Sequence, residues 1–88
     1  DAILKLKQNS ELNIQTLGIR ANNAQKIIQY LFKHPMLDVD KIVEITEVSK
    51  RTAYHLINDL EELGILKEIT GGKRDKLFTF DSYLNLFK

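Results

Sequence analysis

The sequence predicts a mainly α-helical domain with one small β-hairpin, and three features of the chain support this fold class. Residues 39–63 carry apolar side chains at helical spacing on both sides of a short turn. A second amphipathic segment, residues 20–34, precedes them. Two apolar stretches typical of strands, residues 65–70 and 76–80, flank the turn-forming residues 71–75. This order predicts a winged helix-turn-helix fold, with a three-helix core, a wing and an N-terminal helical extension.

The composition excludes several classes of chemistry. An 88-residue chain with 43% hydrophobic and 28% charged residues is large enough for one small globular core. It has no cysteine, and its two histidines, His34 and His55, are too few for a metal site without carboxylates. Neither a glycine-rich phosphate loop nor a nucleophile next to a base is evident. We therefore predict no catalytic residue, no metal and no cofactor in this chain.

The charge is unevenly distributed, although the net charge is only +1. Residues 1–37 carry five basic and two acidic side chains, a net charge of +3, whereas residues 38–88 carry eight basic and ten acidic ones, a net charge of −2. DNA-binding domains are usually clearly basic, because neutralisation of phosphates dominates their affinity. By net charge, the helix-turn-helix part is a weak DNA binder unless its basic side chains cluster.

Neither a signal peptide nor the run of roughly 20 apolar residues that a membrane helix needs is present. We therefore expect a cytoplasmic protein without membrane contact. The chain starts at Asp1 rather than at methionine, which predicts a fragment of a longer protein. Within it, we expect residues 1–19 to form a helical extension or linker and residues 20–88 to form the winged helix-turn-helix domain.

The first 17 residues are expected to be helical, with apolar side chains compatible with one helical face at Ile3, Leu6, Ile14 and Leu17. The polar residues 8–10 interrupt this pattern, so either one long helix runs through them or Ser10 caps a second helix. Gly18 either weakens the helix, since glycine costs a helix about 1 kcal/mol relative to alanine, or marks a bend. Apolar residues beyond the needs of a small core favour contact with a second copy of the chain or another domain.

The segment 20–34 is predicted to be a helix that ends before Pro35, because the residue before a proline avoids the α region. Its apolar side is formed by Ala21, Ala24, Ile27, Ile28, Leu31 and Phe32. Residues 36–39 are then expected to form an extended link or one strand.

The two helices of the motif have predicted caps. Asp40 is the expected N-cap of the first helix and Ser49 that of the second, residues 50–62. Glu47 and Val48 form the turn. Glu47 occupies a position where many helix-turn-helix motifs have glycine, and a left-handed conformation there would cost about 1 kcal/mol. We therefore expect a slightly different turn geometry.

Gly64 is predicted to end the second motif helix, because glycine adopts the left-handed backbone conformation after a helix at little energetic cost. The hairpin follows, with its tip at residues 71–75. Asp81 or Ser82 can cap a last helical turn over residues 83–88.

The solvent face of the second motif helix is the candidate functional site. The N-terminal residues of such a helix reach base edges in the major groove of DNA. We predict a DNA-reading face made of Ser49, Lys50, Arg51, Thr52, Tyr54, His55 and Asn58. In it, Arg51 is suited to guanine and Asn58 to adenine, and the others can contact phosphates or bases. The alternative is an ordinary solvated helix face.

The predicted wing tip adds basic residues to this site. Lys73, Arg74 and Lys76 could reach a neighbouring phosphate strand or the minor groove. The alternative is a solubilising loop whose charges protect the edge of the hairpin, and Asp75 lowers the local positive charge.

Other side chains are given structural or neutral roles. Asp59, Glu61 and Glu62 are expected to face solvent, where they would repel nearby DNA. His55 is expected to be exposed, and the tyrosines are expected to be half-buried packing residues, namely Tyr30, Tyr54 and Tyr83.

Several segments resemble the C-terminal winged helix of Fic family proteins. Residues 20–35, RANNAQKIIQYLFKHP, resemble the helix that precedes this domain, and residues 39–86 resemble the domain itself. The most specific part is the ending, in which GILKEITG is followed by KR and then by FTFDSYL. The resemblance covers about residues 18–88.

The resemblance implies a parent protein whose Fic domain transfers AMP from ATP to a hydroxyl of a protein target. The motif of that domain, HPFxxGNGR, is absent, since His34 and Pro35 are followed by MLD. The resemblance therefore implies a role in recognition, regulation or assembly. Three functions stay open: binding of double-stranded DNA, a protein contact (a homodimer through the N-terminal helices or the Fic domain of the same chain), and a free-standing transcription regulator.

Overall fold

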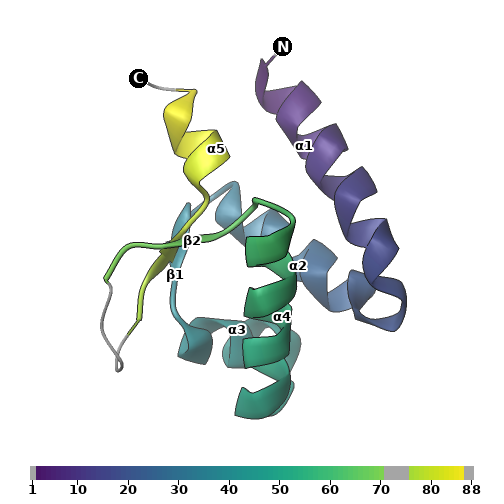
Figure 1. Ribbon diagram of the computed structural model, residues 1–88, viewed down its shortest axis with the longest axis vertical. Coiled ribbons are helices and arrows are strands. Elements are labelled where there is room, and N and C mark those ends of the chain that lie inside the picture. The colour runs from purple at the N-terminus through teal and green to yellow at the C-terminus, as the bar shows by residue number, and fades with distance from the viewer. Residues whose placement is uncertain (1, 71–75, 87–88) are drawn as a thin grey trace.

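The computed structural model describes residues 2–70 and 76–86 and has the predicted order of α-helices and strands (Figure 1). In addition, a 3-10 helix that was not predicted follows the first helix, which ends at Ile14 rather than near residue 17. The helices α2, α3 and α4 form the centre, the strands lie on one side of α4, and α1 packs on α2 and reaches α5. The elements in chain order are α1 (Ala2–Ile14), the 3-10 helix η1 (Gln15–Arg20), α2 (Ala21–Leu31), β1 (Met36–Leu37), α3 (Val39–Thr46), α4 (Lys50–Glu62), β2 (Lys67–Glu68), β3 (Phe78–Thr79) and α5 (Asp81–Asn85). This is a mainly helical fold with a small antiparallel sheet, as a winged helix requires.

One hydrophobic core joins these elements. Four apolar residues of α4 are buried in it, namely Ala53, Leu56, Ile57 and Leu60. Phe80 is fully buried and meets the ring of Phe32 edge-on, with centroids 5.2 Å apart. Tyr83 lies against Phe32 at a centroid distance of 5.1 Å. The aromatic side chains therefore fasten the C-terminal end of the chain to the end of α2.

The helix α1 is continuous, so the polar residues 8–10 do not interrupt it. Ser10 is 3% exposed and lies inside the helix rather than capping a second one. Ile14 belongs to the common core, so the C-terminal end of α1 is packed against the rest of the domain. Of the two effects expected of Gly18, the bend is present, with φ 65° and ψ −121°, a conformation that is essentially restricted to glycine.

The cap of α3 differs from the prediction. The backbone N–H of Lys41 donates to Oδ1 of Asp38 at 2.8 Å, so Asp38 is the N-cap and Asp40 lies inside the first turn. Asp38 has the extended backbone that a cap needs, and it lies three residues before the amide that it accepts from. In α4 the predicted cap is confirmed, because the N–H of Thr52 donates to Oγ of Ser49 at 3.2 Å.

The turn of the motif contains a left-handed residue. Glu47 has φ 57° and ψ 35°, so the expectation of a different turn geometry was wrong. Its N–H donates to the carbonyl of Val43 at 2.8 Å, which closes α3 before the short connection to α4. After α4, Gly64 has φ 76° as predicted, and the N–H of Ile65 then donates to the carbonyl of Leu60 at 2.8 Å.

The sheet has three strands in the order β1-β3-β2, all antiparallel. Thr79 of β3 lies opposite Met36 on one side and Lys67 on the other. The link after α2 therefore contains a strand, one of its two predicted forms, and β2 and β3 are shorter than expected. The predicted hairpin tip, residues 71–75, lies outside the described residues.

The last helix begins earlier than predicted. Phe80 is the N-cap residue of α5 and makes no side-chain cap hydrogen bond, while Asp81 and Ser82 lie inside the helix. The N–H groups of Tyr83 and Leu84 both donate to the carbonyl of Phe80 at 3.1 Å. The residue at the N-cap position of α5 thus has its side chain buried in the core instead of capping the helix.

Candidate nucleic-acid interface

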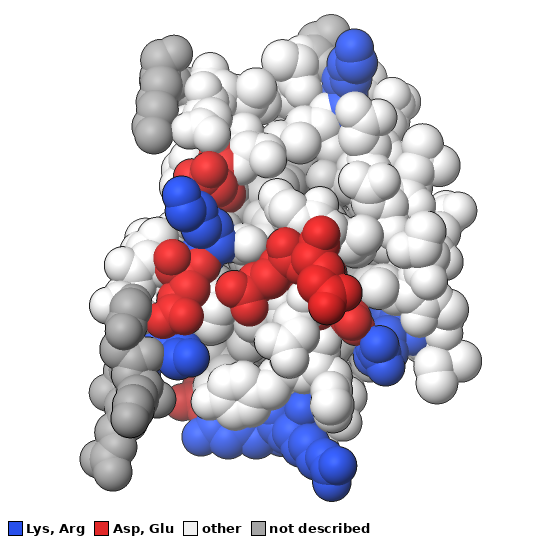
Figure 2. All heavy atoms as spheres, in the orientation of Figure 1, with Lys and Arg blue, Asp and Glu red and all other residues white. Residues whose placement is uncertain are grey.

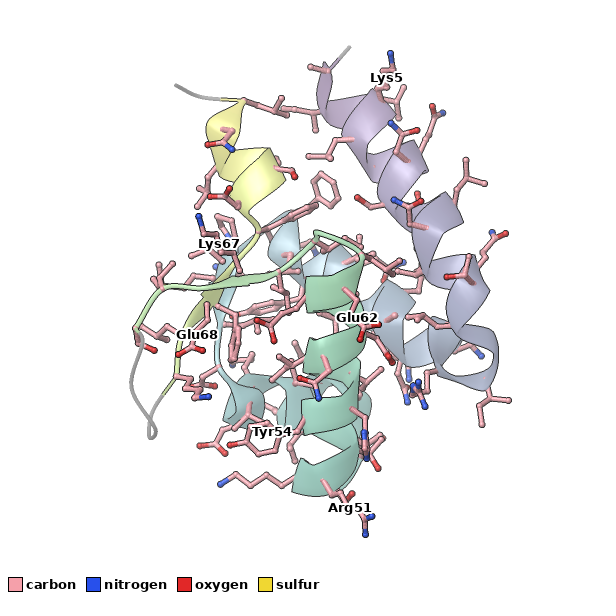
Figure 3. All side chains as sticks on the ribbon, in the orientation of Figure 1. Lys5, Arg51, Tyr54, Glu62, Lys67 and Glu68 are labelled. Carbon is pink, nitrogen blue, oxygen red and sulfur yellow. The ribbon has the colours of Figure 1, made fainter. Side chains whose placement is uncertain are left out.

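The helix α4 presents one polar face to solvent. The apolar residues of α4 point into the core. On the opposite side of the helix, a row of residues at spacings of four, three and four consists of Arg51, His55, Asn58 and Glu62. All of these side chains are exposed. Figure 3 shows Arg51 at the N-terminal end of α4 and Glu62 near its C-terminal end. The face therefore changes from basic to acidic along the helix.

Lys50 and Tyr54 lie beside this row. Tyr54 is 46% exposed and lies on the hairpin side of α4 (Figure 3), so the prediction of a half-buried packing role was wrong for it, although Tyr30 and Tyr83 are half-buried. The reason is its position in the helical repeat, which points away from the four buried residues of α4. An exposed aromatic ring next to basic side chains is available for contact with a ligand.

Ser49 and Thr52 are partly engaged in capping the helix. Besides accepting from the N–H of Thr52, the hydroxyl of Ser49 donates to Oγ1 of Thr52 at 3.1 Å. Thr52 is half-buried. These two predicted site residues therefore have a structural role at the start of α4, and Lys50, Arg51, Tyr54, His55 and Asn58 remain as the exposed candidates.

The charges of α4 oppose the helix dipole. The first turn has no acidic residue and contains Lys50 and Arg51, and the last turn has no basic residue and contains Glu61 and Glu62. Figure 2 shows basic side chains at the lower end of the face and acidic ones above them. Cations at a helix N-terminus and anions at its C-terminus are each unfavourable by about 0.3–1 kcal/mol. Helix stability therefore does not explain this distribution.

Asp59 is paired rather than facing solvent, which corrects the prediction. Nε of Arg20 lies 2.6 Å from Oδ2 of Asp59, and Nη2 donates to Oδ1 at 3.2 Å. The Asp59 side chain is only 15% exposed, whereas that of Arg20 is 43% exposed. The hydrogen bond and the charge of Asp59 raise the pKa of Arg20. Glu61 and Glu62 are exposed as predicted.

Arg20 is the residue of this surface that the sequence interpretation did not find. It belongs to η1, and its partner is 39 residues away in the sequence. No local pattern indicates such a pair. Residues 50–58 of α4 contain no acidic side chain, and the bond to Arg20 pairs Asp59, the first acidic residue of the helix.

The neighbouring helix α3 adds acidic groups near the basic end of α4. Nζ of Lys50 lies 3.6 Å from Oδ1 of Asp40, and both side chains are largely exposed. Lys41 donates to Glu44 at 3.0 Å, and this bond raises the pKa of Lys41. Glu47 is exposed as well. Among the lysines and arginines of α3 and α4, Lys41 and Lys50 thus have acidic partners, whereas Arg51 in the first turn of α4 has no ion pair with any described residue.

The wing contributes one described residue of the predicted site. Nζ of Lys76 lies 3.7 Å from Oε1 of Glu68, so its charge is partly offset. Lys73 and Arg74 fall in the segment that the structure does not describe. Within residues 2–70 and 76–86, no group of three potential ligands lies close enough to hold a metal ion. No helix in those same ranges is long and apolar enough to cross a membrane.

Comparisons with known proteins found a matching family model and a longer relative. A family model described as protein adenylyltransferase SoFic-like, C-terminal domain, matches residues 19–83, from Arg20 and η1 through α4 and the sheet. An uncharacterized protein of Methanocaldococcus jannaschii is 26% identical over 84 aligned residues, which cover 91% of this chain and 16% of that protein. The chain thus spans only a small part of the curated relative that it matches.

Proposed function

The chain belongs to the family of SoFic-like protein adenylyltransferase C-terminal domains, and from this premise we propose that it binds duplex DNA through the N-terminal half of α4. The match over residues 19–83 confirms the resemblance to the Fic C-terminal domain that the sequence motifs indicated. The match does not include a catalytic domain. Adenylyl transfer by the whole protein is therefore part of the proposal, with this domain as its recognition module.

The charge distribution of α4 is the observation that carries the proposal. Lys50 and Arg51 sit at the end of the helix where its dipole disfavours cations, and Arg51 is exposed without an ion pair to any described residue. An external anion supplies a reason for placing them there. In DNA the backbone phosphates are anionic, and the major-groove edge of guanine presents hydrogen-bond acceptors to a basic side chain.

The geometry of α4 fits insertion by its N-terminal end. A helix of 13 residues is about 20 Å long, and the major groove is roughly 12 Å wide and 8.5 Å deep. In this orientation Arg51 and His55 face base edges, and Asn58 lies at the edge of the groove. Glu61 and Glu62 stay outside, where they do not oppose the phosphates.

A binding measurement tests this function. We expect the chain to bind a randomised duplex pool at about 50 mM salt, with selected sequences that contain guanine. Arg51→Ala should lower the affinity by roughly 5- to 150-fold, the loss expected for a bidentate base contact. Lys5→Ala removes the same charge from α1, far from Arg51 (Figure 3), and is the matched control. Absence of binding to any duplex contradicts the proposal.

A protein contact through α1 is the second candidate function. Leu4 and Leu12 on the outer side of α1 are 54% and 62% exposed, and Ile19 in η1 is 97% exposed. Leu12 borders an open hollow together with Gln8, Glu11 and Gln15. Such apolar exposure supports contact with a second copy or with the Fic domain of the same chain.

Light scattering on the isolated chain tests whether this second function involves a homodimer. If α1 forms a homodimer, Leu4→Ser with Leu12→Ser should convert it to a monomer, because both side chains are exposed in the single chain and would be covered by the second copy. The circular dichroism spectrum should keep its helical signal, which shows that the monomer is folded. A wild-type chain that is monomeric at all concentrations excludes the homodimer.

A further inference from the structure

Arg20 has hydrogen-bonding capacity that its ion pair does not use. A guanidinium carries five N–H donors, and Asp59 accepts from Nε and from one N–H of Nη2. The remaining donors have no hydrogen-bond partner within the described ranges 2–70 and 76–86. Since 43% of the side chain is exposed, these donors are open to an external acceptor.

The position of Arg20 relative to α4 complements that of the wing. Figure 1 shows the β2–β3 hairpin on one side of α4 and the corner between η1 and α2 on the other. Arg20 is at this corner, as the last residue of η1, and reaches α4 at Asp59. A helix in the major groove has a phosphate strand on each side of it. Each side of α4 therefore carries a basic group, Arg20 on one and Lys76 on the other.

Asp59 gives the guanidinium a fixed orientation. Two hydrogen bonds to one carboxylate hold the plane of the Arg20 fork, so little side-chain freedom is lost when it binds. The planar fork with charged donors matches phosphate oxygens well. At the same time the carboxylate of Asp59 is satisfied and only 15% exposed, which limits its repulsion of DNA.

From these observations we propose that Arg20 binds a DNA backbone phosphate on the side of α4 opposite the wing, with Asp59 as the residue that positions it. The proposal rests on the proposed DNA binding by α4 and adds a contact from outside the helix-turn-helix motif. It gives η1 a role in binding, and it explains why an acidic residue on α4 is compatible with a DNA-reading face.

The salt dependence of binding tests this contact. Each neutralised phosphate contributes about 0.9 to the slope of log K against log salt concentration. The slope for the unsubstituted chain is compared with those of Arg20→Ala, Asp59→Asn and the double variant Arg20→Ala/Asp59→Asn. We expect the slope to fall by about 0.9 in both variants that lack Arg20 and to stay unchanged in Asp59→Asn.

The double variant separates a phosphate contact from a merely structural or general electrostatic role. It removes one positive and one negative charge, so the net charge is that of the unsubstituted chain. It also leaves no unpaired partially buried carboxylate, so it folds even if Arg20→Ala alone does not. A wild-type slope in the double variant overturns the role of Arg20.

Arg51→Ala serves as the reference in the same titrations. If this variant loses affinity while the double variant keeps both the wild-type affinity and the wild-type slope, DNA binding by α4 stands and the Arg20 contact is wrong. If the unsubstituted chain binds no duplex, both are overturned. Thermal melting of every variant, measured by circular dichroism, confirms that the compared chains are folded. The variant Arg20→Lys keeps the positive charge but lacks the planar guanidinium fork, so it should keep the salt-dependence slope and bind with a several-fold lower affinity.

Discussion

Nζ of Lys50 lies 3.6 Å from Oδ1 of Asp40, so the first residue of α4 faces an acidic residue from the preceding helix. Both side chains are largely exposed, and an exposed pair of this kind contributes about 0–1 kcal/mol to stability. In a complex with DNA, Lys50 would exchange this carboxylate for a phosphate, and Asp40 would lie close to the backbone. The pair therefore connects the fold of the motif with the DNA binding that we propose for α4.

Replacing Asp40 should consequently strengthen DNA binding. We expect Asp40→Asn to raise the affinity by roughly 1.4- to 5-fold, because exposed charge interactions are worth about 0.2–1 kcal/mol. Fluorescence anisotropy with one selected duplex measures the change. Asp81→Asn removes the same charge from α5 and should leave the affinity unchanged. Equal effects of both substitutions would indicate a response to net charge alone.

The corrected helix cap gives a stability prediction. Asp38→Ala should lower the free energy of unfolding by about 1 kcal/mol, because it removes the acceptor for the N–H of Lys41. Asp40→Ala should change it by less than about 0.5 kcal/mol, since Asp40 makes no cap hydrogen bond and its ion pair is exposed. Urea denaturation measures both values. A larger loss in Asp40→Ala would restore the original assignment of the cap.

The left-handed turn residue predicts a stabilising substitution. Glu47→Gly should raise the free energy of unfolding by about 0.5–1 kcal/mol, because the strain of a non-glycine residue at φ 57° exceeds the extra chain entropy of glycine. Glu44→Gly, inside the same helix, should lower it by about 1 kcal/mol. Chemical denaturation of the pair distinguishes relief of strain from loss of an acidic charge, because both variants lose the same charge.

The aromatic contacts of Phe80 predict a strong dependence of the fold on this side chain. Phe80→Ala should lower the free energy of unfolding by about 3–5 kcal/mol, since the ring is fully buried against Phe32 and Tyr83. Leu86→Ala, at a residue that is 40% exposed, should cost much less. Thermal melting, measured by circular dichroism, compares the two variants. Similar melting temperatures would show that the contacts among the rings of Phe32, Phe80 and Tyr83 do not stabilise the core.

The sequence alone determined the features that depend on neighbouring residues. The bounds of α4, its cap by Ser49 and its end at Gly64 follow from hydrogen bonds and dihedral angles within a few residues. The four buried residues of α4 follow from the helical period. The exposure of Arg51 and Asn58 followed from the same period, and their contact with DNA stays a prediction.

Only the tertiary structure decided the features that join distant segments. The pairing of Arg20 with Asp59 spans 39 residues, and the pairing of β1 with β3 brings the link after α2 into the sheet. Which of two nearby acids caps α3 depended on where the strand before it ends. Helical periodicity predicts which residues share one face of a helix, but not which other segments lie beside that face. Those neighbouring segments are determined by packing between elements that are far apart in the chain.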